Sequence, residues 1–244
     1  MKLLPLACLA LVALCNSVFA AAPGVKIIKD VDYLGAGRKE KLDVYLPESP
    51  APGKLAPALV WIHGGGWSGG EKGEQRAQEI CGTLAAAGYV AVSIDYRLGN
   101  RSWPQNLLDC KNAVRFLRAK AAEYHLDPNR IAVVGSSFGA AVAVYAGGVD
   151  PRVAAVLSSG GWGDGEKKFK LQHATPEAWT RFNRMLEHGR AELRQGRSIR
   201  VPRFDIVPVR PDMRNNLSTG SILEFPFEVV DSMYRFRSID VVHQ

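Results

Sequence analysis

The sequence predicts an α/β fold, built on a mostly parallel sheet with helices on both faces. Three observations carry this prediction. An apolar run at 131–134 leads through a glycine-flanked turn into a helix of small residues. A second apolar run, at 58–62, leads directly into three consecutive glycines. Around both runs, strand-like and helix-like segments alternate along the chain, which is typical of parallel strands joined by crossover helices.

The expected elements of this sheet follow in chain order from residue 25. Residues 25–34 and 41–46 have strand character, and the turn at 35–38 predicts that they form a hairpin at the sheet edge. Four further strands are expected, all buried, at 58–62, 89–94, 131–134 and 153–157. Three helices are expected between and after them, at 74–87, 104–124 and 140–147.

The turn after the strand at 131–134 has the pattern G-x-S-x-G, with Ser137 at its centre. This pattern between a strand and a helix is typical of a nucleophile elbow, in which a serine hydroxyl is held exposed at the end of a parallel strand. The strained turn demands neighbours without bulk, which Gly135 and Gly139 provide. The pentapeptide alone is common, so the inference depends on its context.

The glycine triplet after 58–62 supplies that context. Its sequence is His63-Gly64-Gly65-Gly66-Trp67. A glycine loop that leaves a strand can turn its backbone N–H groups towards a developing oxyanion. A plain glycine-rich turn is the alternative for either motif alone. Both motifs together, each at the end of a strand, favour a serine nucleophile with an oxyanion hole.

Four motifs occur in the order that is found in a known family. They are HGGGW at 63–67, SIDYRL at 93–98, DPNR at 127–130 and GSSFG at 135–139. From about residue 25 to 161 the chain resembles the α/β-hydrolases of the HGGG type, which include hormone-sensitive-lipase-like carboxylesterases and acetyl and feruloyl esterase-like enzymes. The resemblance implies an α/β-hydrolase fold and a serine hydrolase that cleaves carboxylic esters through an acyl-enzyme on Ser137.

The same resemblance implies roles for the residues around Ser137. The backbone N–H groups of Gly65, Gly66 and Phe138 are expected to form the oxyanion hole. His63 and Asp95 are expected to support the site structurally. No metal or organic cofactor is implied. Asp109, on a helix, and Asp127, in a turn, are interpreted as ordinary residues at those positions, without a catalytic role.

The acid and the base of the triad are unknown from the sequence. The family places them on strands beyond an insertion, in the order serine, acid, histidine, and no such strands are recognisable after residue 161. The tail at 235–244 resembles the segment that precedes the acid-bearing strand in some capped relatives. We therefore expect a chain truncated before its triad is complete. The substitutes left open are three histidines and three aspartates: His173, His188 and His243, and Asp164, Asp205 and Asp231.

Beyond residue 161 the alternation of strand and helix stops. Thr175-Pro176-Glu177 is a helix start, and the helix presents one apolar side with His188 on the exposed side. We expect a signal peptide at 1–20, an α/β-hydrolase core at 21–161, and at 162–244 a cap-like insertion with the start of an incomplete C-terminal part. With its last strands missing, the sheet is expected to have an open edge, and the chain alone to dissolve poorly.

The first twenty residues indicate export. Met1-Lys2 precedes an apolar run at 3–18, and cleavage is expected after Ala20. The mature protein is therefore expected to be secreted or periplasmic, with no membrane span after removal of the signal. Of the cysteines, Cys81 and Cys110 remain; the family places their helices on opposite faces of the sheet, so free thiols are favoured over a disulfide.

The formal net charge of +7 is modest and locally concentrated. Seven arginines lie between 181 and 203, opposed only by Glu187 and Glu192. A solvated helix face is favoured over a surface for an acidic polysaccharide. Nucleic acid is excluded as a partner, because the basic residues are not interleaved with aromatic residues in the way that is typical of nucleic-acid binding. The expected partner is a small-molecule or polysaccharide-linked ester. The alternatives are a non-catalytic remnant of the same fold, and a peptidase or amidase.

Overall fold

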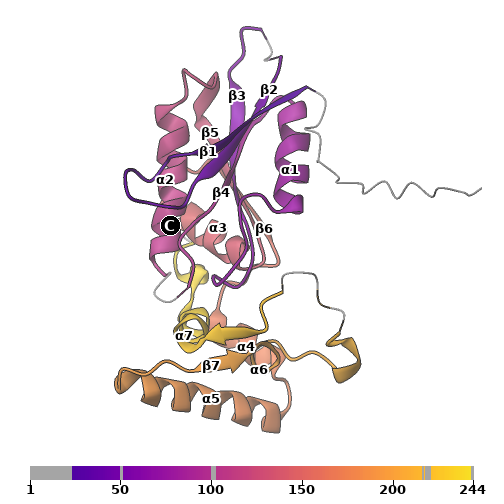
Figure 1. The fold of residues 1–244 in the computed structure, drawn as a ribbon, viewed down its shortest axis with the longest axis vertical. Coiled ribbons are helices and arrows are strands. Elements are labelled where there is room, and N and C mark those ends of the chain that lie inside the picture. The colour runs from indigo at the N-terminus through magenta and orange to yellow at the C-terminus, as the bar shows by residue number, and fades with distance from the viewer. Residues whose placement is uncertain (1–23, 50–51, 100–102, 216, 218–220, 243–244) are drawn as a thin grey trace, which may run out of the picture.

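The computed structural model describes residues 24–49, 52–99, 103–215, 217 and 221–242 (Figure 1). Its centre is a mixed sheet of six strands in the order β1-β2-β4-β3-β5-β6. The strands are β1 (Val25–Val31), β2 (Leu42–Pro47), β3 (Ala56–Ile62), β4 (Val90–Ile94), β5 (Leu126–Ser136) and β6 (Ala155–Ser159). β1 and β2 form the predicted antiparallel edge hairpin, and β4, β3, β5 and β6 run parallel. The predicted signal peptide and His243 lie outside the described residues.

Helices cover both faces of this sheet. α1 (Gln75–Ala86) lies on one side, and α2 (Gln105–Ala119) and α3 (Phe138–Val149) lie on the other (Figure 1). Alternate side chains of β3 enter the two cores, because successive residues of a strand point to opposite faces. Val60 packs in the cluster with α2 and α3, and Trp61 packs in the cluster with α1. The predicted α/β-hydrolase fold class, a mostly parallel sheet between two helical layers, is confirmed.

The strand expected at 153–157 is present as β6, but the expectation that it is buried is wrong. All five residues of β6 are exposed, and the exposed fraction of Leu157 reaches 56%. β6 pairs with β5 on one side only, and among the described residues no strand pairs with its other side. α3 packs against it, and Val156 lies close to the backbone of Gly147. An apolar run therefore marks an edge strand here.

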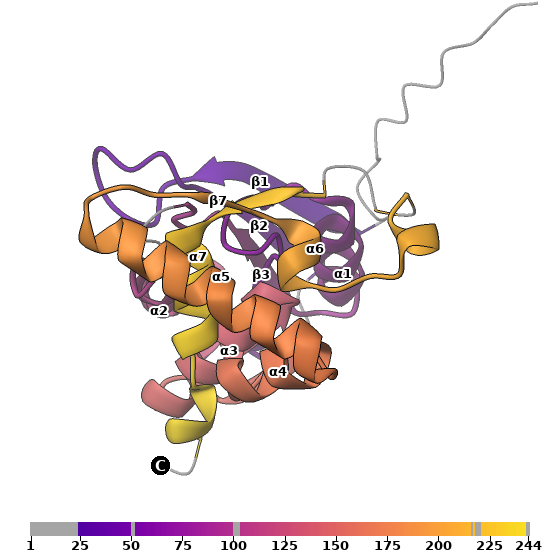
Figure 2. The ribbon, with the colours of Figure 1, turned by 90° about the horizontal axis from the view of Figure 1, so that it is seen from below.

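The residues after β6 form a cap at one end of the sheet, below the strands in Figure 1 and facing the viewer in Figure 2. Its elements are α4 (Gly165–Gln172), α5 (Pro176–Arg194), β7 (Arg200–Pro202), α6 (Arg203–Ile206), η1 (Pro211–Met213), β8 (Glu224–Pro226), α7 (Phe227–Arg235) and η2 (Ser238–Asp240). The Thr175 hydroxyl accepts a hydrogen bond from the Ala178 N–H at 3.2 Å, which begins α5 as the sequence predicts. Phe169, Phe182 and Phe227 are buried, so the cap has an apolar interior continuous with the core of the sheet.

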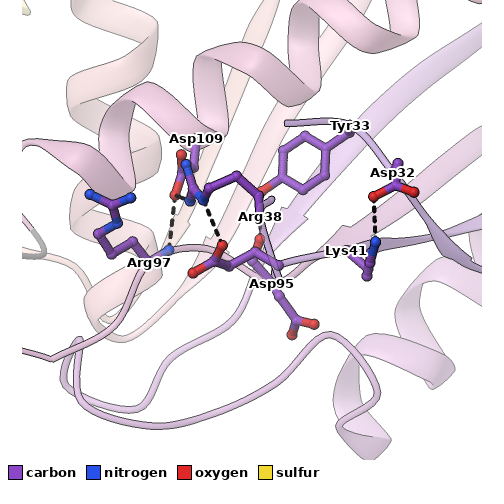
Figure 3. A network of polar contacts seen from close by, with 8 residues as sticks. Asp32, Tyr33, Arg38, Lys41, Asp95, Arg97 and Asp109 are labelled. Atoms are coloured by element: carbon purple, nitrogen blue, oxygen red, sulfur yellow. Dashed lines mark hydrogen bonds and ion pairs between the residues drawn. The ribbon is translucent and has the colours of Figure 1, made fainter. Parts of the chain in front are cut away.

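Asp109 is not the ordinary helix residue that the sequence suggested. Its side chain is 2% exposed and joins two segments that are distant in sequence (Figure 3). One carboxylate oxygen accepts hydrogen bonds from Arg38 Nη2 at 2.8 Å and from the Arg97 backbone N–H at 2.9 Å. Asp109 thereby fixes the chain that leaves β4 against the loop between β1 and β2. Sequence spacing carries no signal for this junction, because its partners lie 71 and 12 residues away.

Cys81 and Cys110 are buried free thiols, as predicted. Cys81 on α1 and Cys110 on α2 belong to different clusters on opposite faces of the sheet.

None of the helices in the described ranges combines the length and the apolar character that crossing a bilayer requires.

Candidate active site

Ser137 lies at the apex of the turn between β5 and α3. Its backbone has φ 52° and ψ −116°, a left-handed conformation that is costly for a residue with a side chain, and the residue is exposed. The flanking glycines make the turn possible. A Cβ added to Gly135 would lie 2.3 Å from the Gly139 carbonyl oxygen, so the two ends of the turn approach too closely for any other residue. A strained, solvent-facing turn of this kind is the geometry that the predicted nucleophile elbow requires.

The glycine loop that follows β3 lies beside Ser137. β3 and β5 are neighbours in the sheet, with Ile62 opposite Gly135, so their carboxyl ends share one edge. A Cβ added to Gly64 would lie 3.1 Å from the Ser137 Cβ. The backbone N–H groups of Gly65 and Gly66 take part in none of the loop hydrogen bonds found in the described part of the chain. They are therefore available as donors at this edge.

Side chains on both flanks hold the loop in place. Trp67 Nε1 donates a hydrogen bond to the Phe138 carbonyl at 3.2 Å, and the Tyr96 hydroxyl donates to the His63 carbonyl at 2.7 Å. His63 is fully buried, with Nδ1 2.7 Å from the Gly64 carbonyl oxygen, and burial lowers its pKa, so the ring stays neutral. Asp95 accepts a hydrogen bond from the Lys72 N–H at 2.7 Å. These contacts are those expected of structural supports of the loop. Nε2 of His63 is buried without a hydrogen-bond partner among the described residues, and neither His63 nor Asp95 lines the cavity that Ser137 faces.

The elbow and the loop form one wall of an open cavity of about 590 Å³, and the cap forms the opposite wall. The core contributes the residues Gly64, Gly65, Gly66, Gly70, Glu71, Glu74, Ser137 and Phe138. The cap contributes Arg203, Ile206, Val207, Ser221, Ile222 and Phe225. The contact between the walls is close, since a Cβ added to Gly66 would lie 2.3 Å from the Phe225 ring. The sequence-predicted nucleophile and oxyanion donors thus line one shared cavity.

None of the histidines in the described ranges lines this cavity. His173 lies in the cap with both ring nitrogens against carbonyl oxygens, Nδ1 2.9 Å from that of Phe169 and Nε2 3.0 Å from that of Asp205. His188 is exposed on α5, as predicted, and His125 is exposed before β5. No histidine of the described ranges therefore contributes to the cavity that Ser137 faces.

The three candidate aspartates have other partners or positions. Asp164 accepts a hydrogen bond from the Lys167 N–H at the start of α4 and pairs with Arg237 at 2.6 Å. Asp231 is buried between Arg190 and Arg235. Asp205 is exposed on α6 and meets His173 through its backbone carbonyl alone. None of the three lines the cavity of Ser137.

Several residues of the cavity wall were not predicted from the sequence. Glu71 and Glu74 lie between the glycine loop and α1, and Arg203 lies on the cap wall. Burial raises the pKa of the Glu74 carboxyl, although Trp61 Nε1 donates a hydrogen bond to it at 3.3 Å. The acidic pair follows the glycine loop directly in sequence, which is a signal that could have been used. Arg203 has no such signal, because only the folded cap brings it near Ser137.

Aromatic side chains pack around Phe138, which follows Ser137 in the chain. Lys168 of α4 is half-buried among them, with Nζ 4.2 Å from the centre of the Trp162 ring, 4.6 Å from that of Phe169 and 5.2 Å from that of Phe138. Among the described residues no carboxylate pairs with this ammonium group. Burial lowers the pKa of Lys168 to about 8. Contact with the ring faces partly offsets the loss of hydration.

We expect Lys168 to be distinguishable by titration. After reductive ¹³C-methylation of the lysines, one dimethylamine signal is expected to titrate at about pH 8, while exposed lysines titrate near their usual value of about 10.4. Lys168→Arg is expected to remove this signal, and Lys167→Arg on the same helix is the control. If every lysine signal titrates near 10, Lys168 is not desolvated in the way that its burial implies.

The chain matches one family model over residues 42–172, more than half of its length, and that model is BD-FAE. The chain belongs to the BD-FAE family. The match begins at β2 and ends with α4, so it includes the glycine loop and the elbow of this BD-FAE chain.

Similar proteins include named esterases. Esterase LipQ of Mycobacterium tuberculosis (strain ATCC 25618 / H37Rv) is 35% identical over 118 residues, which are 48% of this chain and 28% of LipQ. Neutral cholesterol ester hydrolase 1 of Bos taurus is 34% identical over 105 residues, 41% of this chain and 25% of that protein. The solved structure of a bacterial heroin esterase is 28% identical, with a TM-score of 0.45, and the match covers 53% of this chain and 40% of that one. The BD-FAE chain thus spans little more than a quarter of the length of the curated relatives it matches.

Proposed function

We propose that this protein is a serine hydrolase that cleaves carboxylic esters through an acyl-enzyme on Ser137. The observation that carries the proposal is the geometry of one cavity: an exposed serine at φ 52° faces it beside the glycine loop. Membership of the BD-FAE family and similarity to proteins named esterases support the same reaction class. These relatives favour an ester over the peptide or amide bond of a peptidase or amidase.

The reaction would begin with attack of Ser137 Oγ on the ester carbonyl carbon. The carbonyl oxygen becomes an oxyanion as the tetrahedral intermediate forms, and the N–H groups of Gly65, Gly66 and Phe138 would donate hydrogen bonds to it. Loss of one such donor typically costs on the order of 10²–10³ in rate. The alcohol then leaves, and water hydrolyses the acyl-enzyme to release the acid and regenerate Ser137.

The proton of Ser137 requires a base, and none of the described histidines lines the cavity. This observation favours a second candidate function, a non-catalytic protein that binds esters on the same scaffold. The two candidates differ in the reactivity of Ser137. An activated serine reacts with electrophilic phosphorus, whereas an unactivated one in a folded protein does not.

The deciding experiment is covalent labelling with a fluorophosphonate probe, read by intact mass, together with hydrolysis of p-nitrophenyl acetate. We expect one adduct and measurable turnover, both lost in Ser137→Ala. Ser158→Ala, which removes an exposed hydroxyl at the end of β6, is the matched control and is expected to react like the parent. A folded protein without an adduct would contradict hydrolysis and support the binding function.

The substrate and the compartment belong to the same proposal. We propose a small-molecule or polysaccharide-linked ester as the partner, with neither nucleic acid nor a membrane span involved. Secretion or export to a periplasm is proposed from the charged start and the apolar run at 3–18, which lie outside the described residues.

A further inference from the structure

The charges of the Ser137 cavity are separated between its two walls. Glu71 and Glu74 lie on the core side, where the glycine loop leads into α1. Arg203 lies on the cap side, at the first position of α6, and is the one cationic residue among the described residues that line the cavity. Ser137 and Phe138 also line this cavity. A bound substrate therefore meets negative charge on one wall and positive charge on the other.

The Arg203 side chain is held in place but is not neutralised. Its backbone N–H donates a hydrogen bond to the Leu223 carbonyl at 2.7 Å, and Nη1 donates to the Ile222 carbonyl at 3.3 Å. Its Nε is buried and has no hydrogen-bond partner among the described residues. No described carboxylate forms an ion pair with it, in contrast to the paired cap arginines Arg190, Arg197 and Arg237.

Nη2 makes no hydrogen bond to a described residue and is left to donate to a carboxylate oxygen, whereas Nε is closed to solvent in this structure. A small turn of the side chain that opens Nε would give the two parallel donors that match the two oxygens of a carboxylate. A buried donor without a partner is unfavourable, so a ligand that supplies an acceptor gains more than it would from a donor already in contact with water. Ile206, Val207, Ile222 and Phe225 form the apolar surroundings of Arg203 in the cavity. Apolar walls strengthen the attraction between opposite charges because they exclude water.

We propose that Arg203 binds a carboxylate of the substrate, so that the site selects esters that also carry an acidic group. This inference rests on the proposed ester hydrolysis and names its substrate class. Glu71 and Glu74 would repel an acidic group on the core wall, and the two walls together therefore orient the substrate with its carboxylate towards the cap. The carboxylate belongs either to the acyl part or to the alcohol part of the ester, for example a uronic acid.

Binding tests the role of Arg203 without any need for turnover. In a Ser137→Ala background, glutarate represents an acidic acyl part, and galacturonate represents an acidic alcohol part. Titration calorimetry is expected to detect at least one of them, with the neutral comparators glutaramide and galactose binding more weakly. Arg203→Ala is expected to weaken binding by about 10- to 100-fold, as for loss of a charged hydrogen-bond pair. Arg203→Lys keeps the positive charge but lacks the parallel donors of the guanidinium. It is expected to bind more tightly than Arg203→Ala and more weakly than the parent.

The matched control is Arg194→Ala, which removes the same charge from the exposed end of α5, away from the cavity. It is expected to leave binding unchanged. If Arg194→Ala and Arg203→Ala weaken binding equally, the effect is general electrostatics and the proposal is wrong. It is also wrong if neither anion binds better than its neutral comparator, and circular dichroism of each variant excludes loss of folding as the cause.

Turnover then separates this inference from the proposed function. We expect p-nitrophenyl hydrogen glutarate or an O-acetylated galacturonate to have a higher kcat/KM than p-nitrophenyl valerate or an O-acetylated galactose, and Arg203→Ala to remove the preference. Preference for the first ester places the carboxylate in the acyl part, and preference for the second places it in the alcohol part. Hydrolysis without an Arg203-dependent preference overturns the inference alone. Arg203-dependent binding without hydrolysis of any ester overturns the proposed function alone.

Discussion

Gly139→Ala is expected to lower the free energy of unfolding by about 3 kcal/mol. Gly139 lies in the first turn of α3, directly over the end of β3. A Cβ at this position would lie 2.4 Å from the carbonyl oxygens of both Ile62 and His63, and both obstacles are backbone atoms that no side-chain rotation can move. α3 would have to shift away from the sheet, and the Phe138 N–H would move with it. Urea unfolding followed by circular dichroism measures the loss.

Gly163→Ala provides the control for this substitution. Gly163 has no positive φ, and a Cβ there meets its nearest neighbour, the Ile239 Cβ, at an ordinary 3.6 Å. Its effect on the free energy of unfolding is expected to stay within about 0.5 kcal/mol. Equal effects from both substitutions would contradict the close approach of α3 to β3.

Asp109→Ala is expected to lower the free energy of unfolding by about 2–3 kcal/mol. The variant leaves the Arg97 N–H without its acceptor and deprives Arg38 of a buried partner, as Figure 3 makes visible. The remaining partner of Arg38, Glu40, lies on the same loop and cannot restore the connection to α2. Chemical denaturation at neutral pH measures the effect.

Asp32→Ala tests whether burial is the cause. Asp32 also pairs with a basic residue, Lys41, but its side chain is 67% exposed. Exposed pairs contribute about 0–1 kcal/mol, so a clearly smaller loss is expected than for Asp109→Ala. An equal loss in both variants would show that Asp109 acts as an ordinary surface charge.

The chemistry-bearing part of the site could be predicted from the sequence because its signals are local. Two motifs, at 63–67 and 135–139, each follow a strand, and each contains within five residues the glycines that its turn requires. Neighbouring parallel strands then place them together, and a Cβ added to Gly64 would lie only 3.1 Å from the Ser137 Cβ. The residues of the two motifs, and the rule that neighbouring parallel strands end at the same edge of a sheet, are therefore enough to predict that the glycine loop and Ser137 lie together.

The cap wall could not be predicted in the same way. Arg203 and Phe225 reach the cavity through a short two-stranded pairing of β7 with β8, whose partners are separated by irregular chain. No periodicity marks such a contact. The burial of β6 was wrong for a related reason: an apolar run has the same composition whether or not another strand lies beside it. Asp109 shows the limit for polar residues, since a buried carboxylate and a surface one look alike in sequence.

Because the sheet separates the two thiols, each thiol reports on the opening of one of the two helical layers. Cys81 is covered by the layer that contains α1, and Cys110 by the layer that contains α2 and α3. Burial raises the pKa of both thiols, so each reacts with a thiol reagent only after its own layer exposes it. The modification rates of Cys81 and Cys110, read for each residue by mass spectrometry, therefore report whether the two sides of the sheet come apart together or one before the other.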